Sequence, residues 1–162
     1  MAEPVYDVSC YSTHLLIDYA CAHGVSDAQL FEGIEVSPDV LKNPMEWTDF
    51  PSWNRLASNL ERALGGESGV LETVGSEVSA AGVSTYQLMM FRVAPLAEVM
   101  RRAPRHVRTH INRNLDVRAE LRHEGEGDIC LRPLDMGKYS RQMCDFNRGV
   151  IRGILRLKGF ED

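Results

Sequence analysis

The chain has 162 residues, of which 44% are hydrophobic and 25% are charged, and its formal net charge at pH 7 is −5. This length suits one domain with its own core, and the composition is that of a globular protein rather than a disordered one. No run of about 18 apolar residues predicts a membrane-spanning helix, and no signal-peptide pattern opens the chain. We therefore expect a cytoplasmic protein without a membrane partner.

The charge is divided unevenly along the chain. Residues 1–100 hold 14 Asp and Glu against 4 Lys and Arg, whereas residues 101–162 hold 9 against 14. The basic part opens with R-R-A-P-R-H-V-R-T-H-I-N-R-N, a run that could form a nucleic-acid patch. It lacks interleaved aromatic residues and a recognition motif. We therefore expect solvated helix faces and ion pairs between the two halves, with no direct nucleic-acid partner.

Capping residues and apolar spacing predict a series of helices in the first half. The first covers 12–23, with Ser12 as its N-cap and Gly24 just beyond its end. Two short helices follow, one opened by a capping box of Ser26 and Gln29, the other by Ser37 before Pro38. Residues 43–52 form a connection, and a fourth helix runs over about 51–64.

Helices are also predicted over 67–81, with Val70, Leu71, Val74 and Val78 inward, and over 84–91, which is apolar nearly all round. Pro95 and Pro104 each begin a further helical segment. After Asn114 the pattern alternates in D-V-R-A-E-L-R-H, which predicts a half-buried strand. The turn E-G-E-G-D and the return I-C-L-R-P-L-D complete a hairpin.

The last helix, predicted over 140–160, carries an apolar stripe and a separate basic face. Gly149 and Gly153 lie four residues apart within it. Each costs about 1 kcal/mol relative to alanine, so we expect a sheet, a partner helix or a ligand to approach closely there. The fold class is α+β: a bundle of helices, an antiparallel hairpin and a C-terminal helix packed on it, all in one domain over 1–162.

A two-stranded hairpin is marginal alone. We therefore expect either that the last helix covers it or that further strands, and then an output domain, follow Asp162.

The order of these features resembles a known superfamily from about Leu15 to Gly159. The segments that carry the resemblance are V-L-K-N-P-M-E-W-T-D-F-P-S-W-N-R-L-A, V-L-E-T-V-G, F-R-V-A-P-L-A-E-V-M-R-R-A-P-R-H-V and C-D-F-N-R-G-V-I-R-G-I-L. They resemble the haem-nitric-oxide/oxygen-binding (H-NOX) domains and the haem-free H-NOX-like and 4-vinyl-reductase-like sensor domains of bacterial signalling proteins. In that superfamily the last helix is followed by two more strands.

The resemblance implies a small-molecule sensor module, coupled in the same chain to a histidine kinase of a two-component system, a diguanylate cyclase or a transcription regulator. The haem-binding branch needs a proximal histidine before the hairpin, for which His106 and His110 are the candidates. It also needs a Y-x-S-x-R motif, which this sequence lacks, because K-Y-S-R-Q at 138–142 has the wrong spacing. We therefore expect the haem-free type and no cofactor, with a haem-based NO or O2 sensor as the alternative.

Several residues could line a ligand pocket. The soft, adaptable apolar side chains that suit one are Tyr86, Met89, Met90, Phe91 and Met100. Arg118, Arg122 or Arg92 could face an acidic ligand, and the same apolar residues could equally be plain core.

The cysteines and histidines also have simple structural interpretations. Four cysteines, Cys10, Cys21, Cys130 and Cys144, lack C-x-x-C spacing, so packed free thiols are the simplest interpretation. Neighbouring Arg141 and Arg148 could still make Cys144 reactive, and Cys144 is also a candidate for the lining of the ligand pocket. His106 and His110 have the spacing of a metal-binding pair but no third ligand near in sequence, so a pair of surface histidines is the simpler interpretation.

No nucleotide-binding or hydrolase motif is present, so we predict that the domain is not an enzyme. We expect a sensor that works as a homodimer and passes its signal through the last helix. A dimerisation scaffold without a ligand is the remaining alternative.

Overall fold

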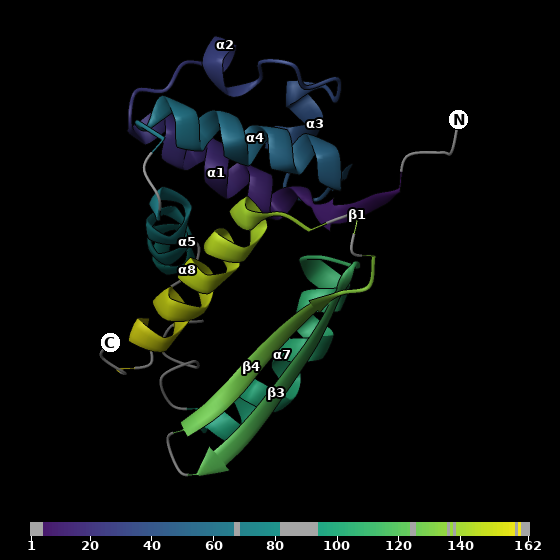
Figure 1. Cartoon of the computed structure of the whole chain (residues 1–162), viewed down its shortest axis with the longest axis vertical. Helices are drawn as coiled ribbons and strands as arrows, with labels where there is room; N and C mark the ends of the chain where they lie inside the picture. Colours follow the sequence, from purple (N-terminus) through teal and green to yellow (C-terminus); the bar gives the residue numbers. More distant parts are fainter. Residues whose placement is uncertain are drawn as a thin grey trace.

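The computed structural model of the chain describes residues 5–66, 69–81, 94–123, 126–135, 137, 139–157 and 159. The fold is α+β, as predicted, with helices, two small antiparallel sheets and a helix at the end (Figure 1). The elements in chain order are β1 (Tyr6–Ser9), α1 (Cys10–Ala22), α2 (Asp27–Leu30), α3 (Pro38–Lys42), β2 (Trp47–Asp49), α4 (Phe50–Ala63), α5 (Val70–Ala81), α7 (Leu96–His110), β3 (Leu115–His123), β4 (Glu126–Pro133) and α8 (Arg141–Leu157). The segment 84–91, predicted as a buried helix, lies outside the described residues.

The core is centred on Trp53 of α4, which is fully buried between α1 and α8. Its indole Nε1 donates a hydrogen bond to Ser12 Oγ at 3.0 Å, and the edge of its ring meets Phe146 with the ring centres 5.7 Å apart. Ser12 was predicted to cap α1, but the helix begins two residues earlier and Ser9 is its N-cap. The reason is that the Ser12 hydroxyl is already used, since it donates to the Ser9 carbonyl and accepts from Trp53.

The two short helices follow their capping signals. The capping box of Ser26 and Gln29 is present at α2, and Ser37 caps α3 with Pro38 in its first turn. Gly24 has φ 73° just past α1, which is the left-handed conformation that glycine adopts at a helix end. Local chemistry therefore accounts for these boundaries.

Strands β1 and β2 were not predicted. They are only four and three residues long and pair with each other in antiparallel fashion. The other edge of β1 is bonded to the turn after α7, where Ser9 N donates to Ile111 O and Arg113 N donates to Asp7 O, both at 2.8 Å. Strands this short show no readable alternation of apolar and polar residues. The residues that they pair with also lie far away in the sequence, so no local pattern predicts them.

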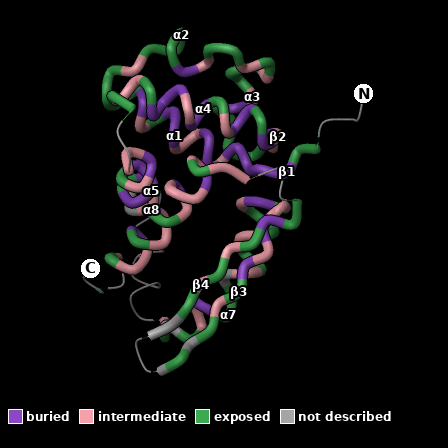
Figure 2. The backbone as a smooth tube through the Cα atoms, in the orientation of Figure 1, coloured by how far each residue is buried: buried purple, intermediate pink, exposed green. Residues whose placement is uncertain are grey.

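Helix α7 and the hairpin β3–β4 form an arm that extends away from the bundle (Figure 1). Pro95 and Pro104 were predicted to begin separate helices, whereas α7 is one helix with Pro104 inside it. Val117 is buried and Ala119 half-buried, whereas Arg118 and Glu120 are exposed, so the alternation predicted for β3 is confirmed. α7 packs against β3, and the burial pattern in Figure 2 shows the arm far more exposed than the bundle.

Helix α8 packs mainly on α5, and not on the hairpin as we had expected. A Cβ atom added to Gly149 would lie 2.9 Å from Ser76 N, and one added to Gly153 would lie 2.5 Å from Ser76 O. Gly75 on α5 faces them, since its added Cβ would lie 3.0 Å from Val150 N. The close approach predicted from the two glycines is therefore present, with a partner helix as its cause.

None of the helices within the described ranges is long and apolar enough to cross a membrane.

Candidate functional site

The predicted pocket residues fall on separate parts of the structure. Tyr86, Met89, Met90 and Phe91 lie outside the described residues. Met100 is buried on α7. Arg118 is exposed on the outer face of β3, where its Nε lies 3.3 Å from an oxygen of Asp116. Cys144 is half-buried on α8.

Arg118 and Met100 lie on opposite sides of the arm. Arg118 pairs with exposed Cys130 across the hairpin, whereas buried Val117 points to the side that α7 covers. The described structure therefore does not gather Met100, Arg118 and Cys144 around one cavity.

His106 and His110 lie next to each other on the exposed surface of α7, with their rings tilted by 43° and the ring centres 4.9 Å apart. Desolvation of the ring, and secondarily the neighbouring His110, lower the pKa of His106 from its usual value. No group of three or more His, Cys, Asp or Glu able to hold a metal ion occurs in the described part of the chain. Both imidazoles are exposed in the described structure, and a haem bound to either of them stays a prediction.

A groove of about 970 Å³ lies between the segment 33–37 and the start of α4. Its walls come from β1, the loop before α3, β2 and the first turns of α4. Apolar surface is contributed by Tyr6, Ile34, Val36, Val40, Trp47 and Pro51. A concave surface that combines aromatic side chains with a few polar groups is the usual form of a small-molecule site. We refer to it as the Trp47 groove.

Acidic side chains outnumber basic ones in the Trp47 groove. Glu35, Glu46 and Asp49 line it together with a single cation, Arg55. Asp49 is held in place as the N-cap of α4, where its two carboxylate oxygens accept from Ser52 N at 2.7 Å and Ser52 Oγ at 3.2 Å. Glu35 and Glu46 are exposed at the rim. The groove therefore favours a ligand that carries positive charge.

Trp47 joins this groove to the arm. The guanidinium of Arg113, at the start of the turn into β3, lies 3.7 Å from the centre of the Trp47 ring. Arg113 also donates from Nη1 to the Tyr6 carbonyl at 3.5 Å, and Tyr6 is another wall of the groove. Two groove residues thus hold the point at which the arm begins.

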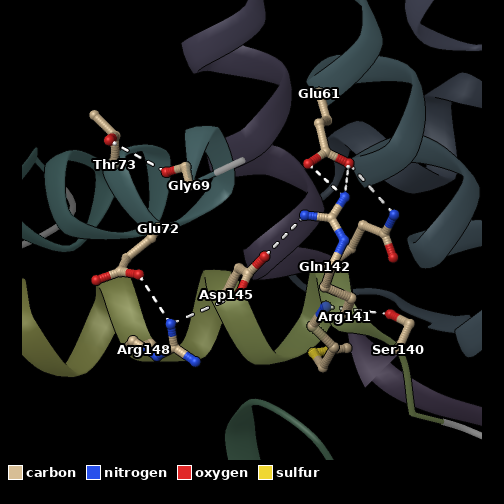
Figure 3. A network of polar contacts seen from close by, with 10 residues as sticks. Glu61, Gly69, Glu72, Thr73, Ser140, Arg141, Gln142, Asp145 and Arg148 are labelled. Carbon is tan, nitrogen blue, oxygen red and sulfur yellow. Dashed lines mark hydrogen bonds and ion pairs between the residues drawn. The ribbon is translucent and has the colours of Figure 1, made fainter. Parts of the chain in front are cut away.

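A network of ion pairs holds α8 to the bundle (Figure 3). One Nη atom of Arg141 lies 2.7 Å from both carboxylate oxygens of Glu61, a buried residue of α4. Gln142 Nε2 donates to the same carboxylate at 3.3 Å, and Arg141 also pairs with Asp145.

A second group of contacts lies further along α8. Glu72 of α5 accepts from Arg148 at 3.2 Å and pairs with Arg152. Arg156 Nη1 lies 3.2 Å from Ser76 Oγ. The expected pairing of the acidic first half with the basic second half is confirmed at Glu61 and Glu72.

Tyr139 and Cys144 lie together beside the core at the start of α8. Burial, and then hydrogen bonding to Cys144, raise the pKa of the Tyr139 hydroxyl well above its usual value, and Arg148 offsets part of this rise. The thiol of Cys144 therefore has the half-buried hydroxyl of Tyr139 as a hydrogen-bond partner, and its reactivity stays a prediction.

The groove was missed in the sequence because its central aromatic residue lies in a segment predicted as a connection. The signal was present in N-P-M-E-W-T-D-F-P-S, where Asp49 stands three residues before Ser52 and directly before the Phe50-Pro51 helix start. That capping pattern fixes where Trp47 must lie relative to α4. The partner of Trp47, Arg113, is far away in the sequence and has no local signal.

Comparison with known proteins found no family model that matches the chain and no significant match among curated proteins or solved structures.

Proposed function

We propose that this chain is a small-molecule-sensing regulatory domain of a bacterial signal-transduction protein, haem-independent and itself without enzymatic activity. It would act in the cytoplasm as a homodimer, with a kinase, cyclase or transcriptional output downstream in the same protein. The observation that supports this most directly is the double role of Trp47, which lines the groove and stacks on Arg113.

A ligand in the Trp47 groove would act through that shared ring. The Arg113 contact holds the turn into β3, so any ligand that binds better when the contact is formed favours the docked position of the arm. A ligand that competes for the ring favours the released position. In either case the shift is limited by the difference between the ligand's affinities for the two states.

The ligand class follows from the walls of the groove. Aromatic and aliphatic side chains would take an apolar body, and the acidic rim at Glu35 and Glu46 would take an amine or another cation. We therefore propose a small organic cation with an aromatic or aliphatic body.

The route to an output domain would be α8, because it packs on both α4 and α5 and is the last helix in the described part of the chain. Its contacts are ion pairs and a glycine-lined crossing. Both kinds of contact fix α8 to particular residues of α4 and α5. We therefore propose that α8 would move as a rigid body when these two helices move, and would pass that movement to the output domain.

The proposal is tested with three probes that differ in charge: 2-phenylethylamine, 2-phenylethanol and phenylacetate. Isothermal titration should show binding of the amine, weaker binding of the alcohol and no binding of the acid. Hydrogen exchange at the amides of Ser9 and Arg113, which bond β1 to the turn, should change when the amine binds.

The variant Glu35→Gln/Glu46→Gln should weaken binding of the amine about tenfold, whereas Glu120→Gln, an exposed acid on the hairpin, should leave it unchanged. Equal binding of all three probes, or no binding of any, would contradict the ligand class. Binding without any change in exchange at Ser9 and Arg113 would contradict the coupling to the arm.

A further inference from the structure

The strand β4 has one edge bonded to β3 and another edge that no other described segment meets. The hairpin is a sheet of two strands only, with β3 and β4 as neighbours. Beyond the pairs with β3, the one backbone bond at this end is Leu134 N to Asn114 O, which lies past the end of the strand. A strand of eight residues with an open row of N–H and C=O groups is a template for another strand.

The two faces of β4 differ in chemistry. Ile129 and Leu131 pair with Ala119 and Val117, so they point to the same side as the buried Val117. They remain half-exposed, because α7 packs mainly on β3. The opposite face presents Asp128, Cys130 and Arg132, all exposed.

The sequence of β4 is complementary to a second copy of itself in an antiparallel pair centred on Cys130. In an antiparallel pair of two copies centred there, Asp128 of each copy faces Arg132 of the other, and Ile129 faces Leu131. Residues directly opposite point to the same side of a sheet, so charges meet on the polar face and apolar side chains meet on the α7 face. Centring the pair on Ile129 would oppose Asp128 to Cys130 instead, and centring it on Leu131 would oppose Arg132 to Cys130.

Arg132 lies directly opposite Asp116 in the hairpin, but the ion pair of Asp116 is with Arg118. Within the part of the chain that the structure describes Arg132 has no ion-pair partner, whereas Asp128 is already paired with Arg122 of β3. In the paired sheet, Asp128 would lie between Arg122 of its own copy and Arg132 of the other. Across the polar face, Asp116 and Arg132 of one copy would then adjoin Asp128 of the other, with Glu120 of that copy beyond it.

We propose that two copies of this chain associate through the free edges of β4, in antiparallel register about Cys130, to form one four-stranded sheet with the order β3–β4–β4–β3. The gain would fall on β4: a two-stranded sheet is stabilised by further strands or by packing against a helix, and α7 packs mainly on β3. The half-exposed Ile129 and Leu131 would become covered by their counterparts.

This inference rests on the homodimer of the proposed function, and it assigns the free edge of β4 as the interface of that dimer. The edge of β3 also has complementary charges about Ala119, where Arg118 would face Glu120. However, β3 is the strand against which α7 packs, and Arg118 is already engaged with Asp116. The observations therefore favour β4.

Cysteine cross-linking tests the register directly. Opposed residues in an antiparallel pair have Cα atoms about 4.5–5.5 Å apart, within the range that a disulfide spans. Mild oxidation with copper phenanthroline should give a covalent dimer of the whole chain. Cys130→Ser should abolish it, whereas Cys21→Ser, which removes the other exposed thiol, should leave it intact.

A charge reversal with rescue tests the interface without oxidation. Arg132→Asp places like charges opposite each other at two symmetric positions and should raise the dimer dissociation constant about tenfold, measured by sedimentation velocity. Asp128→Arg should also weaken the dimer. The double variant restores opposite charges and should return the constant to within about threefold of the original.

The outcomes separate this surface from the proposed function. A monomer at all concentrations would overturn both the homodimer and the β4 surface. A dimer that gives the covalent species through Cys21, or through Ala119→Cys in a Cys130→Ser background, would overturn the β4 surface alone. Ligand binding by a chain whose β4 edge does not pair would leave the sensor proposal standing and this inference refuted.

Discussion

The side chains of Arg113 and Trp47 are stacked, with the guanidinium carbon 3.7 Å from the centre of the ring. This contact connects a strand of the N-terminal bundle with the turn that begins the arm. It is reinforced by backbone bonds from Ser9 to Ile111 and from Arg113 to Asp7. The attachment of the arm at this turn therefore combines a two-bond backbone bridge with one stacked cation.

Removing that cation should loosen the arm without unfolding the bundle. We expect Arg113→Ala to lower the free energy of unfolding by about 0.5–1 kcal/mol, the usual range for an exposed cation–π contact. Amide exchange at Ser9 should accelerate in the same variant. Arg105→Ala, an exposed arginine of α7, is the matched control and should change neither quantity. Equal exchange in the two variants would show that the backbone bridge alone holds the arm.

The crossing of α5 and α8 should reject even a methyl group. A Cβ on Gly149 would lie 2.8 Å from the carbonyl carbon of Glu72 and 2.9 Å from Ser76 N, both backbone atoms. We expect Gly149→Ala to destabilise the protein by about 2 kcal/mol in urea unfolding. In an open helix the same change would stabilise it by about 1 kcal/mol, so the sign decides the question.

The control for this crossing is Gly137→Ala. There the added Cβ approaches only the Asp135 side chain, at 3.3 Å, so the free energy of unfolding should change by less than about 0.5 kcal/mol. A stabilising Gly149→Ala would mean that the two helices are further apart than described.

The buried indole of Trp53 depends on one hydroxyl group. Ser12→Ala would leave Nε1 without its acceptor inside the core, and a buried unpaired donor costs about 1–3 kcal/mol. Chemical unfolding should show that loss. Thr73→Ala, which removes an exposed hydroxyl that donates to the carbonyl of Gly69 just before α5, should cost less than about 0.5 kcal/mol. Similar values for the two variants would contradict the role given to Ser12.

Stability at high pH should report on Tyr139. The pKa of its hydroxyl in the folded protein is raised above the usual value of about 10, chiefly by burial, so the folded protein keeps a proton that the unfolded chain loses. The stabilisation is present below about pH 10 and is lost as pH rises above that value. Above pH 10 the free energy of unfolding should fall less steeply with pH in Tyr139→Phe, by up to about 1.4 kcal/mol per pH unit. Parallel pH profiles for the two proteins would contradict this.

Those parts of the fold that depend on local chemistry could be predicted from the sequence. The caps of α2 and α3, the glycine end of α1 and the alternation of β3 each need only a few neighbouring residues. The start of α1 was wrong because Ser12 is claimed by Trp53, a residue of another helix. Likewise, the glycines of α8 predicted a close approach but could not name α5 as the partner.

The candidate site was harder to predict for the same reason. Trp47 acquires its role from Tyr6, on another strand, and from Arg113, on the far side of α7. None of these residues lies in a motif, and the apolar cluster that seemed the better pocket, at 86–91, lies outside the described residues. A site assembled from three distant segments leaves little trace in any one of them.

The position of α8 in the chain also has a consequence for how the protein folds during synthesis. Helix α5 packs mainly on α8, and the acids Glu61 and Glu72 form ion pairs with arginines at 141–152. Until the ribosome has released those residues, the bundle has one open apolar side and carboxylates that lack their arginines. Folding should therefore end in a single late step in which Phe146 closes against Trp53. A chain stalled before Phe146 should be captured by chaperones that bind apolar surface, whereas one released after Leu157 should not.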